Sequence, residues 1–198
     1  MKIVLNDVDY PIKPLTIEQY LAIKDNPNIG EVELIALMIN VPVDLIRKAP
    51  MAEVKFVAKM LMSELSNLDN TSPLVLDLYF KGNKYGLLRP SRMTYEEWIN
   101  MEVFMAQKPV NLLKLATHLY RPLDGENYGE QRKLIAYDLA ECEAREDEFR
   151  SFPVDIILSA LFFLTTFVRT LMEDSQSSSP KKKTPDLNER MKNLLPKK

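Results

Sequence analysis

The chain has 198 residues, of which 46% are hydrophobic and 27% are charged, as in an ordinary folded domain. The length suits one domain of about 170 residues with a tail, or two small units. The single cysteine, Cys142, excludes an internal disulfide and a multi-cysteine metal site. The net charge of −2 argues against general binding to nucleic acid. The first residues do not follow the basic-then-apolar pattern of a signal segment.

The charge is unevenly distributed along the chain. Residues 181–198 hold seven basic and two acidic side chains, a net charge of +5, so residues 1–180 carry −7. An acidic body with a basic tail favours contact of the tail with an acidic surface, on a partner or on the protein itself. Nucleic-acid binding through the lysines at 181–183 is not favoured, because no aromatic residues lie among them.

A hairpin followed by a capped helix is predicted at the start of the chain. Residues 2–12 alternate as two short strands around Asn6 and Asp7, which accept the positive φ of a tight turn. Thr16 then has the position of a helix N-cap, and Gln19 stands three residues later. These two side chains predict a capping box.

The same order of elements recurs in mid-chain. Residues 76–88 predict a second hairpin with its turn at Gly82 and Asn83. Thr94 and Glu97 then repeat the capping-box spacing. The recurrence has two explanations, an internal duplication or the chance repeat of a common strand-to-helix connection. Both predict two hairpins that lead into helices.

Apolar spacing and helix-ending prolines predict the remaining elements. The predicted helices are 16–25, 31–40, a short one from Pro42 that ends before Pro50, 51–67, 94–107, one that begins at Pro109, 139–149 and 153–171. Residues 69–73 and 121–131 are predicted to be loops.

These elements define an α+β fold in which helices predominate, and the two hairpins can pair in one small antiparallel sheet. The C-terminal tail is predicted to be disordered, because it is rich in Ser, Pro and Lys. The predicted organisation is a single domain at 1–172, with a division into 1–70 and 71–172 left open, a flexible linker at 173–185, a short amphipathic helix at 186–195 and a tail at 196–198.

Residues 153–171 are the most apolar stretch. Only 13 residues separate Asp155 from Arg169, whereas a membrane span needs about 20 apolar residues. We therefore expect a core helix and no membrane span. A helix that is apolar on all sides must be surrounded by other helices or by a partner chain, which leaves a homo-oligomer open.

A candidate partner-binding site lies in the tail. Leu187, Met191, Leu194 and Leu195 fall at i, i+4, i+7 and i+8 of a short helix, the pattern of a peptide that docks in a helix-binding groove. The alternative is that this segment packs on its own domain or frays.

The sequence predicts no catalytic, cofactor-binding or metal-ligating residues. His118 is the only histidine, and Cys142 stands between Glu141 and Glu143, which disfavour a reactive thiolate. No glycine-rich phosphate-binding motif occurs. The acidic residues of 138–148 leave open a hydrolase or nuclease that uses paired carboxylates such as Glu141 and Glu146, although a solvated helix face is the favoured interpretation.

In residues 34–50 a short predicted helix ends in a proline-containing turn, and a second proline precedes another predicted helix. This pattern resembles that of tail-assembly chaperone-like proteins of tailed bacteriophages. Residues 15–20 after the hairpin, 111–122 and 152–163 are similar to that family as well. The resemblance extends over residues 1–170 but not over the tail.

This resemblance implies a non-enzymatic role in virion assembly. Proteins of this kind hold an apolar tape-measure or hub chain soluble until tail subunits polymerise around it. We therefore expect a tail or baseplate assembly chaperone or adaptor that binds a larger virion structural protein in the host cytoplasm. The alternative is a structural component, an adaptor or a packaged internal protein, that remains in the virion.

Overall fold

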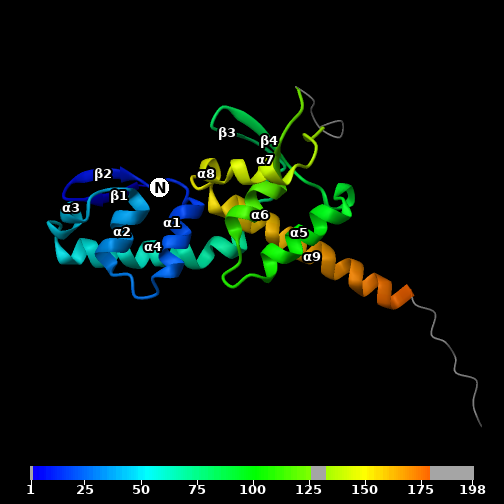
Figure 1. The fold of residues 1–198 in the computed structure, drawn as a ribbon. Helices are drawn as coiled ribbons and strands as arrows, with labels where there is room; N and C mark the ends of the chain where they lie inside the picture. The colour runs from blue at the N-terminus through cyan, green and yellow to red at the C-terminus, as the bar shows by residue number, and fades with distance from the viewer. Residues whose placement is uncertain (1, 126–132, 179–198) are drawn as a thin grey trace, which may run out of the picture. The chain divides into compact units, whose positions relative to one another are not determined.

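The computed structural model describes residues 2–125 and 133–178, and Figure 1 traces its elements. The fold is α+β and predominantly helical, as predicted, with two small antiparallel sheets in the described part of the chain. The described residues up to Leu164 form one compact unit, and the described residues from Thr165 form a second. The boundary between the units lies within the last described helix, α9 (Val154–Ser178).

The first hairpin is confirmed. Strands β1 (Lys2–Leu5) and β2 (Val8–Pro11) are antiparallel, and Asn6 and Asp7 have φ angles of 52° and 60°. The backbone N–H of Asn6 donates to the Glu53 carboxylate over 3.2 Å. Because Glu53 lies in the first turn of α4 (Met51–Thr71), this bond attaches the turn to that helix.

The first capped helix is also confirmed. Thr16 accepts from the Gln19 backbone, and the Gln19 side chain accepts from the Thr16 backbone, at the start of α1 (Ile17–Asp25). The chain beside this cap pairs with the segment that leads into α9. The Ile17 N–H donates to the Phe152 carbonyl over 2.9 Å, and the Val154 N–H donates to the Leu15 carbonyl over 2.8 Å. Two distant parts of the sequence are therefore held together at the starts of two helices.

Three helices follow in the N-terminal half. They are α2 (Glu31–Ile39), α3 (Val43–Arg47) and α4. Asn40 ends α2 in the left-handed conformation, with φ of 55°, a conformation that Asn tolerates better than most residues. Helix α4 extends to Thr71, so the predicted loop at 69–73 begins too early.

The second hairpin forms, with two differences from the prediction. Strands β3 (Asp77–Phe80) and β4 (Asn83–Leu87) meet at a turn of Lys81 and Gly82, one residue earlier than expected. Strand β4 also pairs with a third strand, β5 (Tyr120–Pro122), where a loop was predicted. The two hairpins belong to separate sheets, so the option of one shared sheet is wrong.

Helix α5 (Tyr95–Ala106) has the predicted capping box of Thr94 and Glu97 and follows a short 3-10 turn, η1 (Pro90–Arg92). Helix α6 (Leu112–Leu119) begins later than predicted, because Asn111, and not Pro109, caps it. The Asn111 side chain accepts from the Lys114 N–H over 3.1 Å.

The predicted charged helix at 139–149 is divided into α7 (Leu139–Ala144) and α8 (Glu146–Phe149). Helix α9 then begins at Val154 and ends at Ser178, beyond the boundary at 172 that the sequence suggested. Between Val154 and Leu164 one face of α9 is buried, but Phe162 is 66% exposed and Phe163 is 38% exposed. Of the two surroundings expected for this helix, other helices of the chain do not cover it on all sides, and cover by a partner chain stays a prediction.

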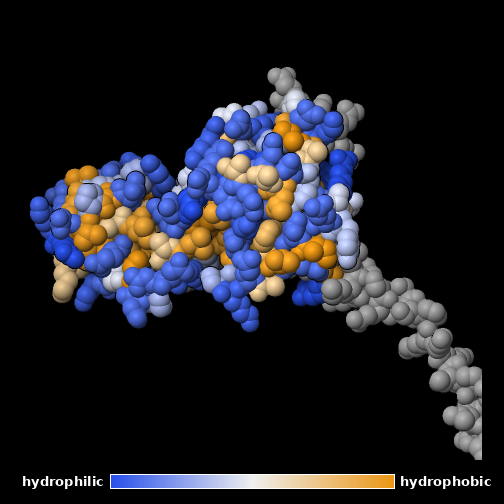
Figure 2. Space-filling model, viewed as in Figure 1, coloured by the Kyte–Doolittle hydropathy of each residue, from blue (hydrophilic) through white to orange (hydrophobic). Residues whose placement is uncertain are grey.

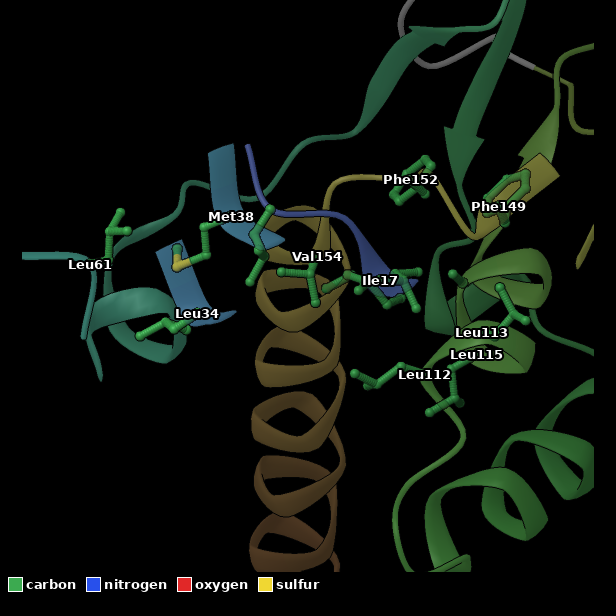
Figure 3. Packing of buried hydrophobic residues seen from close by; sticks show 14 of the residues in the cluster. Ile17, Leu34, Met38, Leu61, Leu112, Leu113, Leu115, Phe149, Phe152 and Val154 are labelled. Carbon is green, nitrogen blue, oxygen red and sulfur yellow. The ribbon is translucent and has the colours of Figure 1, made fainter. Parts of the chain in front are cut away.

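A single hydrophobic cluster joins the helices of residues 1–164 to the second sheet, and Figure 3 shows part of it. The rings of Phe149 and Phe152 are stacked, with centroids 4.9 Å apart. Phe80 meets both rings edge-on, and Tyr85 meets Phe149 in the same way. Edge-on and offset contacts of this kind are the favoured geometries of aromatic pairs. The cluster fixes the second hairpin against the segment before α9.

Candidate functional site

Two charged residues lie inside the protein, where α5 meets the second sheet. Glu97 and Arg121 have side chains only 3% and 8% exposed, and Glu97 Oε1 lies 2.9 Å from Arg121 Nη1. The other carboxylate oxygen of Glu97 accepts from the Thr94 backbone over 2.5 Å. Each charge thus has an opposite charge within contact distance, which offsets part of the cost of burial. This arrangement ties the start of α5 to β5.

His118 is a buried neutral side chain on α6. Its Nδ1 lies 2.7 Å from the Lys114 carbonyl oxygen, so Nδ1 is the protonated nitrogen that donates. The ring packs edge-on against Phe104 and lies 5.6 Å from the ring of Tyr137, measured between centroids. Burial is the main cause that lowers the pKa of His118 from its ordinary value. These contacts are those of a packed structural histidine.

Cys142 is buried on α7 and has Arg145 as its polar neighbour. Arg145 Nη2 lies 3.3 Å from the Cys142 sulfur. Burial raises the pKa of the thiol and outweighs the lowering by Arg145. The thiol pKa thus shifts in the expected direction, but the main cause is burial and not the glutamates at 141 and 143. No contact in the described structure brings Cys142 and His118 together as a catalytic pair.

The carboxylates of 138–148 bind to neighbouring parts of the protein. Asp138 caps α7 by accepting from the Glu141 N–H over 3.2 Å. The ammonium group of Lys114 lies 3.0 Å from Glu143 and 3.7 Å from Glu146. Within the described ranges, 2–125 and 133–178, no group of three or more acidic, histidine or cysteine residues has the arrangement of a metal site. These carboxylates therefore cap α7 and attach α7 and its neighbour Glu146 of α8 to α6 through Lys114.

A groove of about 710 Å³ opens beside α1 and α2. Gln19 crosses between these helices, with its amide nitrogen 2.7 Å from the Leu37 carbonyl oxygen. Apolar side chains of Ala22, Ile39 and Val41 contribute to the lining, together with the carboxylates of Glu18 and Glu33. The groove has room for side chains of a partner, but its lining does not specify one.

The most regular exposed apolar surface lies on α5. Tyr95, Ile99 and Val103 recur every four residues and are 81%, 38% and 52% exposed; we call them the α5 stripe. Side chains four apart lie on the same face of a helix. Glu96 and Glu102 are also exposed on this helix. Figure 2 shows that hydrophobic surface is interspersed with hydrophilic surface on the face it displays.

The α5 stripe was not among the surfaces predicted from the sequence. Trp98, Met101 and Met105 form another apolar side of this helix, on which Met101 is fully buried. A second apolar series at i, i+4 and i+8 was present in the same helix and is the pattern that would have revealed the stripe. The predicted tail site, Leu187, Met191, Leu194 and Leu195, lies outside the described residues.

No helix in the described part of the chain is long and apolar enough to cross a membrane. Comparisons with protein-family models, with curated proteins and with solved structures find no match for this chain.

Proposed function

We propose that this protein is a non-enzymatic assembly factor of a tailed bacteriophage, a tail or baseplate assembly chaperone or adaptor that binds a larger virion structural protein. The observation that supports it best is the α5 stripe, whose three apolar side chains are exposed on one helix face. The resemblance of residues 34–50 and 152–163 to tail-assembly chaperone-like proteins supports it independently.

The surface has properties that such a role requires. Large apolar side chains that gather on one exposed face are typical of protein–protein contacts. On α9, Phe162 and Phe163 add further exposed aromatic surface. The net charge of −7 on residues 1–180 favours solubility through mutual repulsion while these apolar groups face water.

Co-expression with an aggregation-prone partner tests the proposal. The partner is the tape-measure or hub protein encoded in the same phage genome, and the measurement is its soluble fraction with and without this chain. We expect the soluble fraction to rise several-fold and the two chains to co-purify. If the partner stays insoluble and no other co-encoded tail protein binds, the proposal is wrong.

A chain that ends at Asp174 separates the two candidate binding regions. Equal solubilisation by this chain and the full-length chain places binding on the folded body, whereas loss of solubilisation places it in the tail with Leu187 and Met191. Mass spectrometry of mature particles then distinguishes a chaperone, which leaves the particle, from a structural component, which stays at fixed stoichiometry.

A further inference from the structure

The exposed face of α5 has an ordered arrangement of apolar and acidic side chains. At about 100° of rotation per residue, Tyr95, Ile99 and Val103 fall within a sector of about 80°. Glu102 borders this sector on the side of Tyr95, and Glu96 borders it on the side of Val103. The buried residues of the helix, Glu97, Met101 and Phe104, point to the opposite side. An apolar stripe with a carboxylate along each edge is therefore presented outward.

The two bordering carboxylates are not neutralised within the described structure. Neither Glu96 nor Glu102 forms an ion pair with another described residue. The hydroxyl of Tyr137 accepts from the Asn100 side chain on the same helix over 2.7 Å. Glu96 contributes to raising the pKa of Tyr137, although burial of the phenol is the larger cause. Negative charge thus remains at the edges of the α5 stripe.

We propose that the α5 stripe binds an amphipathic helix of a partner protein whose apolar residues are bordered by lysine or arginine. The stripe extends over nine residues, and Val103 lies eight steps after Tyr95, about 12 Å along the helix at 1.5 Å per residue. This length matches two turns of a partner helix with apolar residues at i, i+4 and i+7. Basic residues beside them would meet Glu96 and Glu102. This inference rests on the proposed function and specifies the chemistry of the partner.

The test uses the full-length protein and two synthetic helical peptides of about 18 residues, a length at which helices begin to be stable in water. Both peptides have the same leucine stripe; one has lysines along its edges and the other has glutamates. Fluorescence anisotropy measures the affinity of each. We expect the lysine peptide to bind roughly tenfold more tightly at low salt, and this preference to shrink as salt screens the charges. Equal affinity for the two peptides would overturn the proposal.

Paired variants locate the contact. Replacing Ile99→Ser together with Val103→Ser should weaken binding of the lysine peptide several-fold, and Glu96→Lys with Glu102→Lys should reverse the preference between the peptides. Phe56→Ser on α4 is the matched control, because Phe56 is 71% exposed outside the stripe. Circular dichroism checks that each variant is folded. Unchanged binding in both α5 variants would place the peptide elsewhere and overturn the proposal.

Two further outcomes would assign the stripe to another occupant. Tighter peptide binding by a chain that ends at Asp174 would show that the protein's own tail competes for the stripe. Self-association that the Ile99→Ser and Val103→Ser changes abolish would show that a second copy occupies it. Each result overturns the assignment to a partner helix. Selective peptide binding without solubilisation of any tail protein would instead reject the proposed function and leave the binding preference of the stripe intact.

Discussion

Glu97 on α5 and Arg121 on β5 form an ion pair inside the protein, with 2.9 Å between Oε1 and Nη1. The same glutamate completes the capping box at Thr94. One side chain therefore caps the start of α5 and also attaches this helix to the sheet. Because the chain passes directly from α6 into β5, the pair also sets α5 relative to α6.

Replacing Glu97→Gln should destabilise the protein by about 3–5 kcal/mol, the cost of leaving one member of a buried pair without its opposite charge. The glutamine amide can still accept from the Thr94 backbone, so the change removes the charge and keeps the cap. Urea denaturation followed by circular dichroism measures the difference.

The exposed pair of Lys2 and Asp9 provides the control for this experiment, since its side chains are 69% and 57% exposed. Asp9→Asn should change the free energy of unfolding by no more than about 1 kcal/mol. A loss of similar size for Asp9→Asn and Glu97→Gln would show that burial does not determine the contribution of the inner pair.

The two capping boxes predict a second pair of effects. Thr16→Ala and Thr94→Ala should each lower the free energy of unfolding by about 1 kcal/mol, because an N–H at the helix start loses its side-chain acceptor. Thr→Ser at the same positions keeps the hydroxyl and should restore most of the loss. If Ser and Ala variants have the same stability, the hydroxyls do not act as caps.

The parts of the fold that follow local rules were predictable from the sequence. The turn at Asn6 and Asp7 and the caps at Thr16 and Thr94 depend on residues within a few positions of each other. Turn and cap chemistry acts over that range whatever the rest of the protein does. The α+β class followed from those local elements.

The features that depend on distant residues were not predictable. Strand β5 was expected to be part of a polar loop, because Arg121 stands at the start of the polar segment 121–131. Arg121 pairs with Gly86 in the sheet, and its guanidinium group forms an ion pair with Glu97. These two contacts with distant residues offset the free-energy cost of burying the Arg121 charge. The α5 stripe was missed for a similar reason, since the sequence does not show which of two apolar faces meets the core.

His118 should make the protein less stable in mild acid. Burial lowers the pKa of the folded-state imidazole below the ordinary value of 6.5, so below about pH 6.5 the unfolded chain binds a proton that the folded protein does not. Stability is then lost as the pH falls from 6.5 towards the folded-state pKa, by at most about 1.4 kcal/mol per pH unit for one such group.

Urea denaturation between about pH 7.5 and about pH 5.5 measures this dependence, which lies in the range where histidine titrates. His118→Gln should remove most of it, because glutamine does not titrate and its amide can still donate to the Lys114 carbonyl. A pH dependence that is the same in the variant would assign the effect to other groups.

Cys142 should react slowly with iodoacetamide in the folded protein. Its side chain is 1% exposed, and burial raises the pKa of the thiol, so both access and the thiolate fraction are reduced. Reaction then depends on opening of the structure, and unfolded fractions of about 10⁻³–10⁻⁶ are typical of stable domains. We expect labelling at least about a thousandfold slower in buffer than in urea.

Mass spectrometry of the alkylated chain gives both labelling rates, and the Cys142→Ser variant should show no labelling. Rapid labelling in buffer would mean that α7 separates from α6 far more often than its packing implies.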